Sequence, residues 1–156
     1  MSRMADLKVR NHVRQCGCRP SGLPWLAAVF VAAVLKAAGP SVWDGVYTAE
    51  QTRRGETAYL QTCASCHGTG LEGGDMTPPL VGGAFTANWN DLTVGDLFER
   101  IRTTMPLDKP GRLSRQQNAD VIAFLLKANG WPAGTVELPP DPPALNQIRI
   151  QSVRVQ

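Results

Sequence analysis

The feature that most constrains this chain is a five-residue motif near its middle, Cys63-Ala64-Ser65-Cys66-His67. Two thiols three positions apart, close to the end of a predicted helix, can face one planar macrocycle and add to its two vinyl groups as thioethers. The adjacent imidazole is then carried beneath the ring, where it can bind the iron from the proximal side. This C-x-x-C-H pattern predicts one covalently attached haem.

Two other uses of a Cys-x-x-Cys pair fit the sequence less well. A structural zinc ion needs four ligands, whereas residues 42–156 contain only two cysteines and one histidine. A thioredoxin-like redox pair needs a βαβ setting, and the pattern along this chain indicates helices. The other two cysteines, Cys16 and Cys18, lie in the N-terminal segment, so no thiols remain for a disulfide framework.

Haem iron in an electron carrier takes a sixth ligand, and two methionines follow the motif. Met76 comes nine residues after His67, still on the loop that leaves the proximal side. Met105 lies just past a predicted helix on a turn that Pro106 stiffens, and only Met105 has enough chain before it to reach the opposite face. We predict Met105 as the axial ligand, against Met76 or a methionine that fills the core. A thioether opposite an imidazole raises the reduction potential.

Three helices are predicted from their start signals, each a Ser or Thr followed three residues later by Gln or Asp. The expected segments are about 48–62, 93–102 and 114–129, and Asn129-Gly130 supplies a stop for the last. No segment alternates clearly enough to predict a strand. The fold class is therefore all-α, with residues 63–92 as an irregular loop wrapped around a large ligand.

Residues 1–41 have the pattern of a secretory leader. A basic stretch ends at Arg19, thirteen uncharged residues follow from Leu23 to Leu35, and Lys36 ends the run. Thirteen residues are fewer than the roughly 17–25 that a helix needs to cross a bilayer, so the run is typical of a signal peptide. We expect cleavage before Val42 and a periplasmic location without a membrane span, with an uncleaved anchor as the alternative.

The charge of the chain excludes a nucleic-acid partner. The net charge of +3 comes from the leader, because residues 42–156 carry ten basic and twelve acidic side chains, a formal charge of −2. A near-neutral domain has no extended basic surface for a polyanion. Within that region we expect one domain over residues 42–132, followed by a Pro-rich C-terminal arm, residues 133–156, that lies over the surface.

Over about residues 48–130 the sequence resembles class I c-type cytochromes. The resemblance rests on Cys63–His67 with Gly68, on Pro78-Pro79-Leu80-Val81-Gly82, and on Thr104-Met105-Pro106. It implies a cytochrome c-like fold of three main helices and long loops around a single covalent haem c. The closest likeness is to single-domain bacterial carriers that serve periplasmic dehydrogenases, often quinoprotein alcohol dehydrogenases.

The resemblance also implies roles for residues outside the motif. The carbonyl of Pro78 is expected to accept the N–H of His67, which fixes the orientation of the ring. The first and last helices are expected to cross at Gly55, Tyr59 and Phe124. Trp89 has two interpretations that stay open, a donor to a haem propionate or a buried indole that needs a partner.

These predictions converge on a one-electron carrier that is not an enzyme by itself. We expect it to accept electrons from a dehydrogenase and to pass them to a terminal oxidase or another cytochrome of a respiratory chain. Such contacts are small and transient, and the carrier would be a monomer. One alternative is a permanent haem subunit of a dehydrogenase or oxidase complex, docked through the Pro-rich arm. A second alternative is a haem enzyme or gas sensor. This is disfavoured, because two protein ligands would leave no position on the iron for a substrate or gas.

Overall fold

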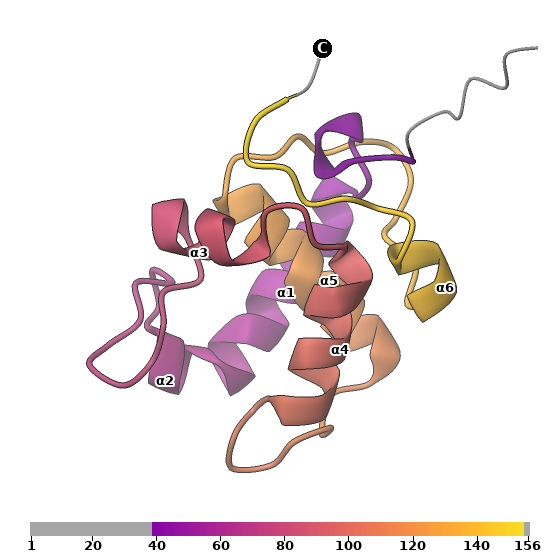
Figure 1. Ribbon diagram of the computed structural model, residues 1–156. Coiled ribbons are helices and arrows are strands. Elements are labelled where there is room, and N and C mark those ends of the chain that lie inside the picture. The colour runs from indigo at the N-terminus through magenta and orange to yellow at the C-terminus, as the bar shows by residue number, and fades with distance from the viewer. Residues whose placement is uncertain (1–38, 155–156) are drawn as a thin grey trace, which may run out of the picture. The chain divides into compact units, whose positions relative to one another are not determined.

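The computed structural model describes residues 39–154, in which short helices follow one another without a strand (Figure 1). They are the 3-10 helix η1 (Val42–Asp44), α1 (Ala49–Thr62), α2 (Ala64–His67), α3 (Gly82–Trp89), α4 (Val94–Thr104), α5 (Arg115–Ala128) and α6 (Pro142–Leu145). β-type pairing within 39–154 is limited to isolated bridges, so the predicted all-α fold class is confirmed. None of these helices is long and apolar enough to span a bilayer. Nearly all of the predicted leader, residues 1–41, lies outside the described residues.

The three predicted helices form, and each begins at its predicted cap. The Thr48 hydroxyl accepts from the backbone N–H of Gln51 at 3.1 Å, at the start of α1. Thr93 and Ser114 open α4 and α5 with complete capping boxes, which satisfy backbone donors that a helix start leaves unpaired. After α5 the chain turns at Gly130, whose φ of 86° is available to glycine at little cost. Local chemistry therefore sets the limits of the main helices.

Helices α1 and α5 cross with their backbones in close contact, and α4 packs on α5 (Figure 1). A Cβ at Gly55 would fall on the carbonyl oxygen of Asp120, so only glycine fits at this point. Beside the crossing, the rings of Tyr59 and Phe124 pack with centroids 5.3 Å apart. The crossing predicted from the resemblance is thus present.

Two helices, α2 and α3, occupy part of the stretch 63–92 that the sequence predicts to be irregular, and this expectation was wrong. Helix α3 has no side-chain cap of its own, because Val81 stands at its N-cap position. Its cap comes from the end of α5, where the Asn129 side chain accepts from the backbone of Gly82 at 3.0 Å and donates to the carbonyl of Leu80 at 2.9 Å. A cap supplied from a distant residue leaves no local signal.

Within the described residues, the C-terminal segment 133–154 contributes apolar side chains to the core instead of lying over the surface, which corrects the prediction of an arm over 133–156. Its buried apolar side chains are Leu138, Leu145, Ile148 and Ile150. The buried side chain of Gln51 on α1 also binds this segment, because its amide donates to the Leu138 carbonyl and accepts from the Leu138 N–H. Scattered prolines indicate an extended path, but they do not reveal that the intervening apolar residues face inward.

The end of this segment joins two distant parts of the chain. The backbone of Arg149 donates to Pro40 and accepts from Val42, each at 2.9 Å. On the other side, the carbonyl of Ile148 accepts from the N–H of Val94 at 2.9 Å. The segment therefore connects the start of α4 to Pro40, at the end of the predicted leader, and to Val42, the first residue of the predicted domain.

The α1–α5 crossing predicts a large penalty for any side chain at residue 55. We expect Gly55→Ala to lower the free energy of unfolding by about 3 kcal/mol, the upper part of the range for overpacking against rigid atoms. The control is Gly83→Ala in α3, where an added Cβ meets nothing within 4 Å and the change should be about 1 kcal/mol or less. Urea unfolding followed by circular dichroism measures both, and equal midpoints would contradict the close approach.

The burial of the C-terminal segment predicts that its apolar residues stabilise the domain. Ile150 is fully buried, whereas Val153 is 70% exposed. We expect Ile150→Ala to cost about 2–4 kcal/mol of unfolding free energy, because it leaves a cavity in the core. Val153→Ala should leave the stability unchanged. If the two variants unfold at the same urea concentration, the segment is a surface arm as the sequence suggested.

Candidate functional site

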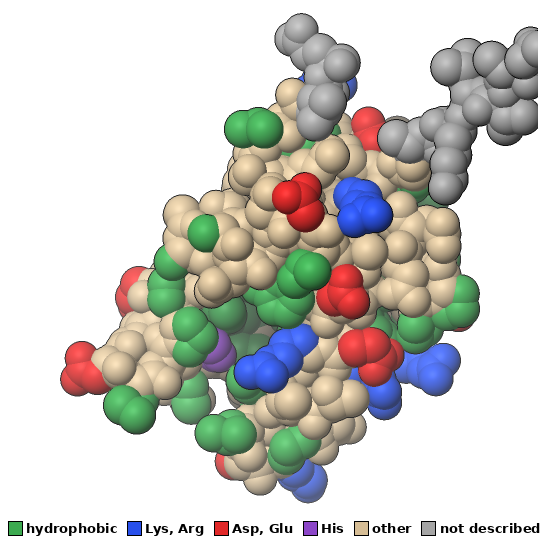
Figure 2. Space-filling model, in the orientation of Figure 1, with side chains coloured by type: hydrophobic (Ala, Val, Ile, Leu, Met, Phe, Trp, Pro, Cys, Tyr) green, Lys and Arg blue, Asp and Glu red, His purple; other side chains and the backbone are tan. Residues whose placement is uncertain are grey.

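A cavity of about 1020 Å³ opens between the C-terminal end of α1, α2, α3, α4 and α5. Apolar side chains form most of its wall, including Leu80, Phe85, Leu97, Val121 and Leu125. Its opening is visible in the space-filling view, bordered largely by hydrophobic side chains (Figure 2). This volume suits a large, flat, apolar ligand.

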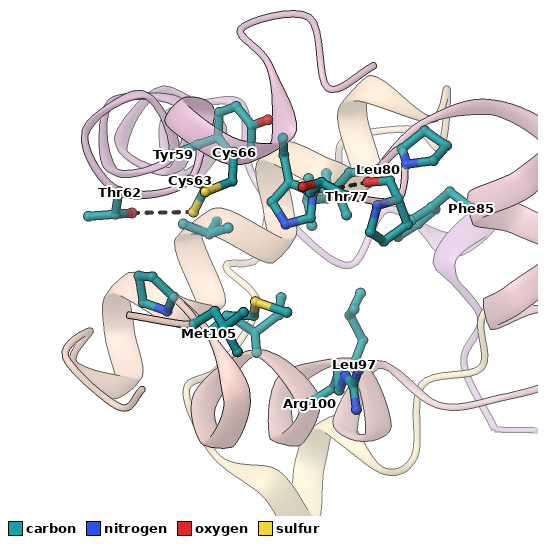
Figure 3. A pocket seen from close by; sticks show the side chains of 18 of the residues that line it. Tyr59, Thr62, Cys63, Cys66, Thr77, Leu80, Phe85, Leu97, Arg100 and Met105 are labelled. Atoms are coloured by element: carbon teal, nitrogen blue, oxygen red, sulfur yellow. Dashed lines mark hydrogen bonds between the residues drawn. The ribbon is translucent and has the colours of Figure 1, made fainter. Parts of the chain in front are cut away.

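The two cysteines of the motif stand on one wall of this cavity (Figure 3). Helix α1 ends at Thr62, and the single turn α2 follows at once, so that the N–H of His67 bonds to the carbonyl of Cys63 at 2.9 Å. Burial raises the pKa of the Cys63 thiol, although the Thr62 hydroxyl at 3.3 Å and the charge of Arg112 act in the opposite direction. Cys66 is exposed at the cavity edge. The turn therefore presents both thiols to the same space.

His67 is buried, and one of its ring nitrogens has a fixed partner. Its Nδ1 lies 3.0 Å from the carbonyl oxygen of Pro78. A carbonyl can only accept, so Nδ1 must carry the proton and Nε2 keeps a lone pair for a metal. The contact implied by the resemblance is present, and it leaves the imidazole in the tautomer that binds iron.

Met105 lines the cavity on the side opposite the two cysteines (Figure 3). It is the C-cap residue of α4, and its N–H bonds to the carbonyl of Ile101 at 2.9 Å. Met76 also borders the cavity, but it is 95% exposed. The structure thus brings all four predicted site residues, Cys63, Cys66, His67 and Met105, to one cavity. Two thiols, an imidazole with a free Nε2 and a thioether are a donor set that fits haem c.

Sequence reasoning missed two cations at this cavity, Arg100 on α4 and Arg112 on the loop before α5. The position of Arg100 was available as a signal, because it lies three residues after Leu97 and next to Ile101, both of which line the cavity. Arg112 lies in a loop without a repeating pattern, so no sequence signal places it. Trp89 also lines the cavity, and its two interpretations stay open.

A buried tyrosine ties α1 to the residue that follows the motif. The hydroxyl of Tyr59 donates to the carbonyl of Gly68 at 2.6 Å. Burial raises the pKa of Tyr59 to about 12, and negative charge on Cys63 and Glu72 acts in the same direction. The phenol is therefore protonated throughout the neutral range and remains a donor.

This bond predicts that Tyr59→Phe affects both stability and the cofactor site. Loss of the donor leaves the Gly68 carbonyl unpaired and should cost about 1 kcal/mol of unfolding free energy. Tyr47→Phe is the matched control, since the Tyr47 hydroxyl donates to the carbonyl of Trp131, which does not line this cavity. Both variants should lose stability, but only Tyr59→Phe should shift the reduction potential of the haem. If the reduction potential shifted equally in both variants, the shift would come from the general loss of stability and not from the Tyr59–Gly68 bond.

Comparison with known proteins identifies the type of domain. Residues 50–125 match the family described as cytochrome c oxidase, cbb3-type, subunit III. No curated protein matches the chain. A chain of the sulfane dehydrogenase SoxCD from Paracoccus pantotrophus is 26% identical, with a TM-score of 0.43, over 57% of this chain and 53% of that one. The chain therefore spans about half the length of that solved relative.

The family match covers the motif turn, the Pro78 loop, the Met105 turn and the helices that form the cavity walls. A domain of this family carries haem c, bound covalently, and transfers electrons. The matched segment, residues 50–125 with its Cys63–His67 motif, is therefore a monohaem class I cytochrome c domain.

Proposed function

We propose that the protein is an exported one-electron carrier with His67 and Met105 as axial ligands of its haem iron. The observation that carries this proposal is the arrangement of the cavity, with Cys63 and Cys66 on one wall and Met105 on the opposite one. The bound haem supplies a one-electron Fe(II)/Fe(III) couple. The side chains of this protein must attach the haem and hold its iron.

The two cysteines anchor the cofactor, and the axial residues hold the metal. Thioether bonds to Cys63 and Cys66 prevent loss of the haem from an exported protein that has no means to reload it. His67 would hold the iron through Nε2, because its Nδ1–H donates to the carbonyl of Pro78 at 3.0 Å. Met105 ligates through sulfur, which stabilises ferrous iron and raises the potential.

If His67 and Met105 both hold the iron, no coordination position would be left for a substrate or gas. This supports a carrier over a haem enzyme or gas sensor. The mostly apolar walls of the cavity would keep water from much of the ring, which would limit reorganisation around it. Electron exchange through a ring edge then needs only a brief contact with a redox partner.

We place the protein in the periplasm, between a dehydrogenase and a terminal oxidase or another cytochrome. Export rests on the pattern of residues 1–41, which lie almost entirely outside the described part. In the alternative, the protein is a permanent subunit of a dehydrogenase or oxidase complex. That alternative requires the Pro-rich arm as the docking segment. Four apolar side chains of that segment, Leu138, Leu145, Ile148 and Ile150, are buried in the domain's own core, which favours the free carrier. Native-size measurement of the exported protein distinguishes the two, because a permanent subunit would never migrate as a single domain.

The assignment of Met105 predicts a specific change in carbon monoxide binding. Met105→Ala should keep the covalent haem, seen as added mass, but its ferrous form should bind carbon monoxide rapidly at neutral pH. Its reduction potential should fall, because a thioether ligand has been removed. Met76→Leu is the control, since Met76 is 95% exposed and should leave both properties unchanged.

The wild-type protein provides the opposing outcome. Rapid binding of carbon monoxide by the wild-type ferrous form would exclude Met105 as a ligand. A polypeptide that weighs no more than its amino acids, after expression with intact maturation machinery, would contradict the covalent attachment at Cys63 and Cys66. If ferrous Met76→Leu bound carbon monoxide rapidly and Met105→Ala did not, Met76 would be the iron ligand instead of Met105.

A further inference from the structure

Residues 40–42 are built into the fold of the domain, although the sequence pattern assigns the first two of them to the leader. The carbonyl of Pro40 accepts from the N–H of Arg149, and the N–H of Val42 donates to the carbonyl of the same arginine, each at 2.9 Å. This pair of bonds forms a parallel β-bridge between Ser41 and Arg149. The first described residues therefore lie beside the C-terminal segment (Figure 1).

Ser41 also begins the first helix of the domain. Its side chain accepts from the N–H of Trp43 at 3.2 Å, and its own N–H donates to the carboxylate of Asp44 at 2.7 Å. These bonds belong to a capping box around η1. Within η1, the indole of Trp43 donates to the carbonyl of Gln151 at 2.9 Å. The cap thus fixes a helix that is itself bonded to the C-terminal segment.

A cut before Val42, the position expected from the sequence, would disrupt both arrangements. Val42 is fully buried, and the cut would turn its N–H into the charged ammonium group of a new N-terminus. Burying a charge costs far more free energy than burying a bonded amide. The same cut removes the cap of η1 and the carbonyl that accepts from Arg149. A cut before Ser41 keeps the capping side chain but still removes that carbonyl.

A cut on the other side of these contacts has neither cost. Gly39 and Pro40 are both exposed, so a new α-amine on either residue stays in water. The backbone already approaches the C-terminal segment at Gly39, where an added Cβ would lie 2.8 Å from the carbonyl oxygen of Gln147. The contact between the two segments is therefore complete only when the chain begins at Pro40 or earlier.

We infer that the leader is removed on the N-terminal side of Pro40, so that Pro40 and Ser41 remain in the exported protein as part of its fold. This inference rests on the proposed export. A leader peptidase cuts after a small residue, in a pattern of the Ala-x-Ala type. The small residues between Lys36 and Pro40 are Ala37, Ala38 and Gly39. Hydrolysis after one of them adds water across that peptide bond, which leaves a carboxylate on the leader and an α-amine on the domain.

The test is the N-terminus of the exported holoprotein. The full chain is expressed with intact export and maturation machinery, and the periplasmic protein is examined by intact mass and N-terminal sequencing. We expect a chain that starts at residue 38, 39 or 40. Any other start, Val42 included, would overturn the inference, and so would an exported chain that keeps its leader.

Two matched variants identify the small residues that the peptidase needs. Ala37→Asn combined with Ala38→Asn removes a small residue from every Ala-x-Ala-type cut before Pro40, and this double variant should accumulate with its leader attached. Ser41→Asn removes the small residue that precedes Val42, while asparagine still caps a helix. It should be processed at the wild-type position. The reverse result would place the cut after Ser41.

Failure of this inference and failure of the proposed function give different results. A periplasmic protein that carries haem and starts at Val42 contradicts the processing site alone. A chain that stays in the cytoplasm, without the added mass of haem, contradicts the proposed export and the covalent attachment instead.

Discussion

The crossing of α1 and α5 at Gly55 is the contact on which the cofactor site depends. Because the residue has no side chain, the two backbones meet, and the ends of both helices are fixed with respect to each other. Helix α1 carries the chain directly into Cys63, and α5 supplies Val121 and Leu125 to the cavity wall. A wider separation at the crossing would move the attachment site away from the wall that it faces.

Several contacts made by chain segments distant in sequence complete the cavity around that crossing. Asn129, at the end of α5, caps α3 and binds the loop at Leu80. The C-terminal segment holds the start of α4, and the indoles of Trp43 and Trp131 both donate to the carbonyl of Gln151 at 2.9 Å. The segment farthest from the motif thus helps to fix the helix that leads to Met105.

The proposed site combines a buried imidazole on one element with a methionine on a separate one. His67 is buried and fixed by the Pro78 carbonyl, whereas Met105 stands at the end of α4, where helix and loop meet. In the proposed site, Met105 would control access to the iron, while Cys63, Cys66 and His67 would control retention of the haem.

Local chemistry made much of this protein predictable from its sequence. The Cys63–His67 motif and the caps of α1, α4 and α5 depend on residues close in the chain, so their patterns can be recognised directly. Only the tertiary structure revealed α3, the buried C-terminal segment and the position of Arg112 at the cavity. Each of these depends on contacts between distant residues, and such contacts leave no local pattern because the chain must fold before they form.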